Sequence, residues 1–133
     1  MSDRRLRLAV GVLSTAGAAV AGYLVYARYT DTTLACVTGG CETVQRSDYA
    51  VLAGVPVAVL GLVAYLVLLA TAFSTSELAR LVGAVVAVSG ALFAAYLLYA
   101  QIVVIDAVCQ WCVTSDVLIA LLAVTCVLRL RSG

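Results

Sequence analysis

Four long apolar stretches, separated by short polar connections, run through the chain. The first, Leu6 to Ala27, has 22 residues, of which only Arg7, next to its start, is charged. The next three are expected at about Pro56 to Phe73, Leu81 to Ile105 and Val113 to Leu128. An α-helix rises about 1.5 Å per residue, so a helix of about 20 apolar residues crosses the hydrocarbon of a bilayer. The pattern predicts an all-α membrane protein, a four-transmembrane-helix bundle forming one domain over residues 1–133.

The longest polar connection, Arg28 to Tyr49, lies between the first two apolar stretches. Within it, the Gly39-Gly40 pair predicts a turn. Residues at helical spacing after this turn predict a short amphipathic helix lying on the end of the bundle; they are Val44, Ser47, Val51 and Leu52. Gly54 is expected to end this helix. Pro56 is expected in the first turn of the next helix, where its missing N–H costs nothing.

Two local patterns concern how the helices begin and how they pack. In the connection before the third apolar stretch, Ser74, Ser76 and Glu77 are typical of the cap at a helix N-terminus. In the first apolar stretch, small residues recur at three- and four-residue spacing and predict a face for close helix packing. These small residues are Gly11, Thr15, Ala18 and Gly22.

The composition supports a membrane domain and narrows the chemistry. Hydrophobic residues make up 65% of the chain and charged residues 11%, with a mean hydropathy of +1.14. Soluble domains carry about a quarter charged residues. A net charge of only +1 gives no reason to expect a nucleic acid partner. Because histidine is absent, the chemistry has to come from cysteine, tyrosine, a few carboxylates or a bound cofactor.

The distribution of arginine predicts the orientation in the membrane. With four spans, both termini and the 74–80 connection lie on one side. That side carries Arg4, Arg5, Arg7, Arg80, Arg129 and Arg131, against Arg28 and Arg46 on the other. The positive-inside rule makes the arginine-rich side cytoplasmic. We therefore expect a multi-pass protein of the cell membrane with cytoplasmic termini and extracytoplasmic cysteine loops, an oxidising location that favours disulfides over metal.

Four of the five cysteines form two pairs in the two external connections. Cys109 and Cys112 are separated by two residues where the last polar connection becomes a helix. The first turn of a helix stabilises a thiolate, so this pair predicts a dithiol/disulfide redox centre. Cys36 and Cys41 lie in the longer loop, and a long loop is expected to give the mobility that thiol–disulfide exchange with the first pair requires. Cys126 lies about 20 Å further along the last helix and is interpreted as a small buried residue.

Other interpretations of the cysteines stay open on the sequence. The pairs could be structural disulfides that only staple the loops of a non-enzymatic membrane scaffold. The four external cysteines could also bind zinc, since their number suits a structural site. Covalent haem attachment is excluded, because Val113 and not histidine follows the second cysteine of the Cys109–Cys112 motif.

Few polar side chains interrupt the last two apolar stretches. Gln101 is a site candidate because it is an amide in an apolar span, and its alternative role is a hydrogen bond between helices. Tyr96 and Tyr99 lie near it, at a depth where tyrosines usually anchor a helix at the membrane interface. Asp116 follows Cys112 by four residues and so shares nearly the same helix face. It could deprotonate or repel a thiol, or cap the last helix.

Together these residues resemble the vitamin K epoxide reductase family, in its bacterial and archaeal branch. The resemblance covers nearly the whole chain. Its most specific parts are Cys41 to Tyr49, Gly54 to Pro56, Gly61, Tyr65, Tyr96 to Gln101, and Cys109 to Cys112, with Cys36 and Ser47 at the positions of a loop cysteine and a short-helix serine.

The resemblance implies a four-helix bundle around a quinone of the menaquinone or ubiquinone type, with Cys109 and Cys112 at its reactive end. It also implies a thioredoxin-like partner that delivers electrons to the loop pair, expected as a separate protein because the chain ends at Gly133. Cys112 is then the quinone-facing thiolate and Cys109 the sulfur attacked from the loop, with Cys41 favoured as the internal shuttle. The expected quinone-binding residues are Ser47, Tyr96, Gln101 and Asp116.

The expected activity is that of a membrane thiol:quinone oxidoreductase that supports disulfide bond formation. One departure from the family limits it. The vertebrate enzymes have a tyrosine four residues after the second cysteine of the motif, which is associated with binding vitamin K and anticoagulants. This chain has Asp116 at that position. Plain quinone reduction is therefore the expected activity here, and the sequence does not determine whether an epoxide is also a substrate.

Overall fold

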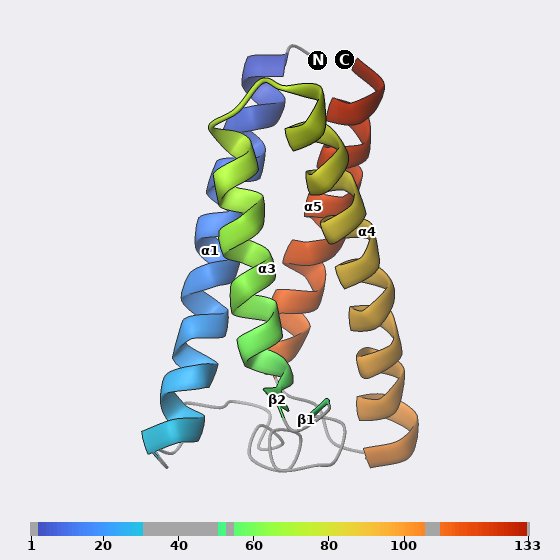
Figure 1. Cartoon of the computed structure of the whole chain (residues 1–133). Helices are drawn as coiled ribbons and strands as arrows, with labels where there is room; N and C mark the ends of the chain where they lie inside the picture. Colours follow the sequence, from blue (N-terminus) through green and yellow to red (C-terminus); the bar gives the residue numbers. More distant parts are fainter. Residues whose placement is uncertain (1–2, 31–50, 53–54, 106–109, 133) are drawn as a thin grey trace.

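The structure is a computed structural model that describes residues 3–30, 51–52, 55–105 and 110–132. Within these ranges the chain is helical apart from two short strands and the connection between the second and third helices. The elements are α1 (Asp3–Thr30), β1 (Val51–Leu52), β2 (Val55–Pro56), α3 (Val57–Ala72), α4 (Glu77–Tyr99), the π-helix η2 (Ala100–Ile105) and α5 (Gln110–Ser132). The long helices lie side by side, with both termini and the α3–α4 connection at one end (Figure 1). The prediction of an all-helical bundle is confirmed.

Three of the described helices are long and apolar enough to cross a membrane, namely Asp3–Ala27, Glu77–Val104 and Gln110–Arg131. Large apolar side chains point outward from them, as in Leu8, Leu92 and Val124, which suits contact with lipid. The fourth helix, α3, has 16 residues. Its length of about 24 Å is less than the roughly 30 Å of a hydrocarbon core. That α3 also crosses the membrane stays a prediction.

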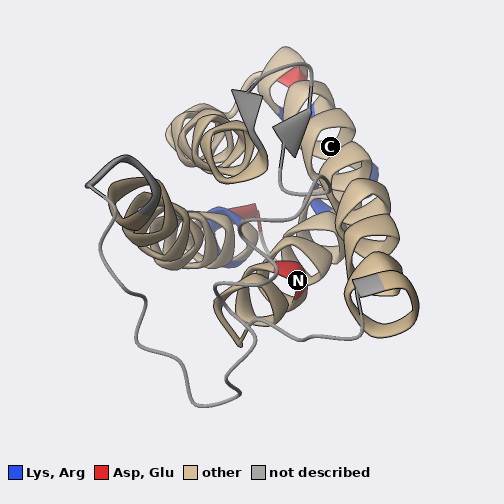
Figure 2. Cartoon of the chain, turned by 90° about the horizontal axis from the view of Figure 1, so that it is seen from below, with Lys and Arg blue, Asp and Glu red and all other residues tan. Residues whose placement is uncertain are grey.

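The helices surround a shared interior when viewed along the bundle (Figure 2). α1 packs against α3 and α5, and α4 packs against the same two helices, so α3 and α5 lie diagonally opposite. The interior contains Val10, Tyr65, Leu68, Ala87 and Leu122. The cap predicted for α4 is confirmed, since the Ser76 hydroxyl accepts a hydrogen bond from the N–H of Ala79 at 3.2 Å.

The short amphipathic helix predicted between the first two helices is not confirmed. Residues 31–50 lie outside the described part, and Val51–Leu52, the predicted end of that helix, form β1. β1 pairs antiparallel with Val55–Pro56. β-Branched valines favour strands, and a four-residue spacing alone does not separate helix from strand. Pro56 ends β2 and α3 begins one residue later, so the proline precedes the helix that was expected to contain it.

The small-residue face predicted for α1 was partly wrong. The buried line of α1 runs through Val10, Ser14 and Gly17 and continues to Ala21 and Leu24. Thr15 is exposed and donates a hydrogen bond to the carbonyl of Gly11, one turn earlier. A Cβ placed on Gly22 would meet no atom within 4 Å. The helix is thus rotated relative to the expectation, because small residues alone do not determine which face meets a neighbour.

Among the described glycines, Gly17 lies closest to a neighbouring helix. A Cβ there would lie 2.1 Å from an atom of the Tyr65 ring of α3. We expect Gly17→Ala to destabilise the fold by about 1–3 kcal/mol, because the ring has to leave its place. Gly22→Ala is the matched control and should be neutral or stabilising by up to about 1 kcal/mol. Denaturant unfolding in micelles measures both, and equal stability of the two variants would contradict this packing.

Arginines bind the end of α3 at the end of the bundle that holds both termini. Arg129 is 2% exposed and donates to the carbonyls of Thr71, at 2.8 Å, and Ser74. Arg7 donates from Nε to the carbonyl of Ala72 at 2.9 Å. The carbonyls of Thr71 and Ala72 lie in the last turn of α3 and have no partner within the helix, and that of Ser74 lies in the connection that follows. Arginine side chains commonly satisfy such groups at a helix end.

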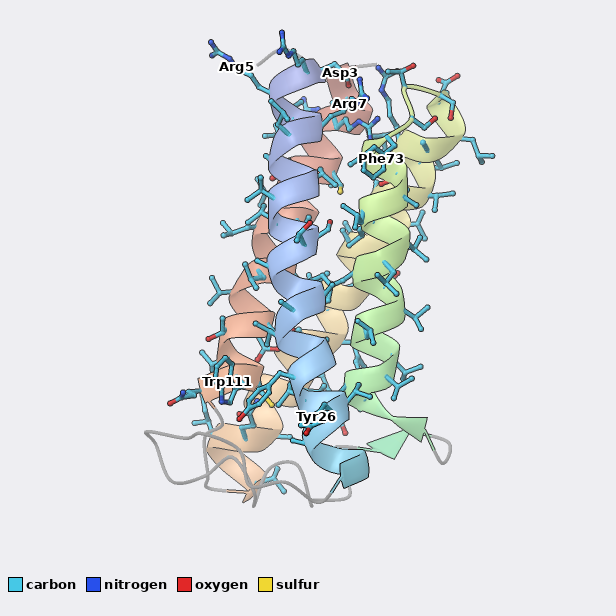
Figure 3. All side chains as sticks on the ribbon, turned by 90° about the vertical axis from the view of Figure 1, so that its left-hand side faces the viewer. Asp3, Arg5, Arg7, Tyr26, Phe73 and Trp111 are labelled. Carbon is cyan, nitrogen blue, oxygen red and sulfur yellow. The ribbon has the colours of Figure 1, made fainter. Side chains whose placement is uncertain are left out.

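Asp3 joins Arg129 to another arginine, Arg80. Its Oδ1 lies 3.4 Å from Nη2 of Arg80 and 3.5 Å from Nε of Arg129. The start of α1, the start of α4 and the end of α5 therefore meet around one carboxylate. Figure 3 shows Asp3, Arg7 and Phe73 at this end.

Candidate functional site

The candidate site is at the opposite end of the bundle, where α5 begins. Gln110, Trp111 and Cys112 form the first turn of α5. The indole of Trp111 packs edge-on against the ring of Tyr23 in α1, with ring centroids 5.0 Å apart and an interplanar angle of 62°. Figure 3 shows Trp111 at the same end as Tyr26 of α1. This aromatic pair docks the start of α5 on the end of α1.

Cys112 is half-buried and packs against a small apolar cluster at the end of α1. The cluster is built on buried Leu24 and Ala27, and Ala58 from the start of α3 also packs on it. The thiol lies in the first turn of a helix, where N–H groups have no partner in the helix and favour a thiolate. The site thus combines a potential nucleophile with apolar walls from two other helices.

The residue that sequence reasoning missed is Tyr65 of α3. Its hydroxyl lies 2.8 Å from the carbonyl oxygen of Ser115 and 2.8 Å from the Ser115 hydroxyl. Ser115 follows Cys112 by three residues. Tyr65 was noticed only as part of the resemblance, because an apolar stretch does not reveal which of its tyrosines points inward.

Gln101 and Tyr96 lie in different environments. Gln101 is 2% exposed within η2, and π-helical turns inside helices are frequent at functional sites. Tyr96 is 53% exposed and its ring lies 6.2 Å from that of Phe93. The structure therefore directs Gln101 inward and leaves Tyr96 on the outer surface, where tyrosines commonly anchor a helix in the interface.

Asp116 is half-buried one helical turn after Cys112 and directly follows Ser115, the partner of Tyr65. It thus belongs to the same local group as Tyr65 and Ser115. Cys126 is 3% exposed, as predicted for a small buried residue. Its sulfur lies 3.7 Å from the place of a Cβ on Gly83.

The remaining predicted site residues, Cys36, Cys41, Ser47 and Cys109, lie outside the described residues. Their disulfides and their approach to Cys112 stay predictions. Within the described ranges no group of three or more His, Cys, Asp or Glu side chains could hold a metal ion. Three of the four cysteines of the alternative zinc site are outside those ranges, so this finding does not test that alternative.

Comparison with protein families gives a match that spans all four helices. Residues 8–127 fit the model described as the Vitamin K epoxide reductase family. This family is in general one of quinone-linked thiol oxidoreductases of the membrane, in agreement with the apolar helices and with the cysteine at the start of α5. The match extends over most of the sequence and confirms the resemblance that the motifs indicated. The chain therefore belongs to the vitamin K epoxide reductase family.

Proposed function

We propose that this protein is a membrane thiol:quinone oxidoreductase that takes electrons from a separate thioredoxin-like protein and so supports disulfide bond formation. The observation that carries the proposal is the position of Cys112. It lies in the first turn of α5 against an apolar cluster formed with Leu24 and Ala27. A quinone needs apolar walls with few polar groups to orient it, beside the thiol that reduces it.

The proposed relay is a series of thiol–disulfide exchanges. The partner's dithiol reduces the Cys36–Cys41 disulfide and becomes a disulfide itself. A loop thiolate, favoured as that of Cys41, then attacks Cys109, forms a mixed disulfide and releases Cys112 as a thiolate. The second loop thiol resolves the mixed disulfide. The Cys109–Cys112 dithiol is then oxidised back to a disulfide, and its two electrons and two protons convert the quinone to a hydroquinone.

Polar contacts to the quinone are proposed for Ser47, Tyr96, Gln101 and Asp116. The burial of Gln101 in η2 supports its part, because a buried polar side chain inside an apolar span is commonly a binding-site residue. The position of Asp116, one helical turn after Cys112 in α5, supports its role as a quinone contact. Tyr96 has less support, since its side chain is mostly exposed.

We further propose four membrane spans with both termini in the cytoplasm. Two observations support this orientation. Both termini and the α3–α4 connection share one end of the bundle (Figure 1), and Arg7, Arg80 and Arg129 gather there. The start of α5, with Cys112, is at the other end and would face the extracytoplasmic side.

The proposal is tested by driving quinone reduction in two ways. The purified full chain is given a ubiquinone or menaquinone analogue and either a reduced thioredoxin-like protein or a small dithiol. In the Cys36→Ser/Cys41→Ser variant the protein-driven rate should fall to background, because the relay is broken. The rate with the small dithiol should persist, because that reductant attacks Cys109–Cys112 directly.

A trapped intermediate provides the second part of this test. In Cys112→Ala the Cys109 thiolate can still attack the Cys36–Cys41 disulfide, preferably at Cys41, and release the other loop thiol. Cys112, which would resolve this bond by re-forming Cys109–Cys112, is missing, so the bond can decay only by reversal and should accumulate. Mass spectrometry of cleaved peptides identifies it. Finding only Cys36–Cys41 in this variant, together with protein-driven turnover in the loop double variant, would contradict the relay. If neither reductant drives wild-type turnover, the disulfides are structural and the scaffold interpretation holds.

A further inference from the structure

Tyr65 reaches through the bundle interior from α3 to α5. Its side chain is 2% exposed, and its hydroxyl contacts both oxygens of Ser115 at 2.8 Å. α3 and α5 are diagonal in the bundle, and each packs chiefly on α1 and α4. The tyrosine therefore makes a direct polar link between two helices that are otherwise separated by their neighbours.

Gly17 of α1 makes this reach feasible. The place of a Cβ on Gly17 lies only 2.1–2.5 Å from three atoms of the Tyr65 ring. Any side chain on α1 at this position would block the path to α5. The ring is thus held beside the α1 backbone, and its hydroxyl is directed to one point on α5.

The hydrogen atoms at this point can be assigned by chemistry. The Ser115 carbonyl can only accept, so Tyr65 has to donate its single hydroxyl proton to it. The Ser115 hydroxyl then donates its own proton to the tyrosine oxygen. Both hydroxyls are satisfied within an apolar interior, where an unmade hydrogen bond is costly. The backbone of α5 is consequently held at Ser115, in addition to its side chain.

Ser115 lies three residues after Cys112, so the two residues share nearly the same helix face and are about 4.5 Å apart along the axis. Holding the Ser115 carbonyl therefore limits the rotation of the first turn of α5. That rotation decides whether the Cys112 thiol points at the apolar cluster of Leu24 and Ala27.

We infer that Tyr65 is a positioning residue, whose hydroxyl holds the Cys112 thiol, through the Ser115 carbonyl, in its orientation toward the reacting quinone. The inference rests on the proposed function, since it gives that orientation a catalytic role. The hydroxyl acts on α5 and does not touch the quinone.

The test uses Tyr65→Phe, which keeps the ring beside Gly17 and removes only the hydroxyl. We expect kcat for quinone reduction to fall by about tenfold or more, since a misplacement of about 1 Å can cost about 100-fold. KM for the quinone should stay unchanged. Ser115→Ala should retain most of the wild-type kcat, because Tyr65 can still donate to the carbonyl. Tyr99→Phe, at an exposed position, is the matched control and should behave as wild type.

A second readout is independent of quinone turnover. In a Cys109→Ser background, the rate at which a maleimide alkylates Cys112 reports the orientation of the thiol. Tyr65→Phe should raise this rate, and Tyr99→Phe should not. If the wild-type protein fails to reduce quinone, the proposed function is wrong. The alkylation rates still test whether the Tyr65 hydroxyl holds the Cys112 thiol in its orientation.

Three outcomes would overturn the inference. One is a raised KM with unchanged kcat, which would mean that Tyr65 binds the quinone itself. Another is a wild-type alkylation rate in Tyr65→Phe. The third is a loss of activity that only follows the fraction of folded protein.

Discussion

Replacing Cys112 by serine is expected to reduce quinone reduction by the full chain to background, whichever reductant is supplied. The side chain lies in the first turn of α5 beside the apolar cluster at the end of α1. A serine hydroxyl fits this place but forms no disulfide, so the pair can no longer carry two electrons. The decrease in quinone absorbance, followed with a small dithiol as reductant, measures the effect.

Cys126→Ala is the matched control for this experiment. Cys126 is in the same helix but about 20 Å further along it, buried among apolar side chains. Its loss should leave turnover near the wild-type rate. Normal turnover in Cys112→Ser would mean that the cysteine pair at the start of α5 is structural, and the scaffold interpretation would then be favoured.

The helices and their order could be predicted from the sequence because the length of an apolar stretch is a property of the chain itself. The cap at Ser76 could also be predicted, since it depends on one side chain and on an N–H three residues later. The position of Cys112 at the start of a helix could be predicted as well, because the sequence shows where the last polar connection gives way to an apolar stretch.

The inward faces of the helices could not be predicted in this way. In a soluble protein the polar residues mark the outer face, whereas here side chains facing lipid and side chains facing the core are both apolar. Gly17 and Gly22 therefore look alike in the sequence, although one lies against the Tyr65 ring and the other meets nothing. The hydrogen bond from Tyr65 to Ser115 depends on which face of each helix turns inward and joins residues 50 positions apart in the sequence.

Arg129 was assigned by its sequence position only to the basic flank of the last helix. In the structure its guanidinium is buried against the end of α3. The cause is the early end of α3 at Ala72, which leaves carbonyls that need donors. An arginine at a helix end can thus contribute to the charge asymmetry that orients the protein in the membrane. The same side chain can also donate hydrogen bonds to the last carbonyls of a neighbouring helix.

Arg129→Ala is expected to be the most destabilising change outside the candidate site. It removes the donors to the carbonyls of Thr71 and Ser74 and one of the two partners of Asp3. Removing one partner of a buried pair typically costs about 3–5 kcal/mol. Because Asp3 is partly exposed and keeps Arg80, we expect the lower end, about 3 kcal/mol. Unfolding by denaturant in micelles measures the loss.

Three further variants separate the causes of this loss. Arg131→Ala, at an exposed position in the same turn, should change stability by no more than about 0.5 kcal/mol. Arg129→Lys should recover only part of the loss, because a single ammonium lacks the planar fork that reaches two carbonyls. Asp3→Asn should cost less than Arg129→Ala, because both carbonyl bonds remain. If Asp3→Asn lowered the stability as much as Arg129→Ala, the main contribution of Arg129 would be its ion pair with Asp3 and not its hydrogen bonds to the carbonyls at the end of α3.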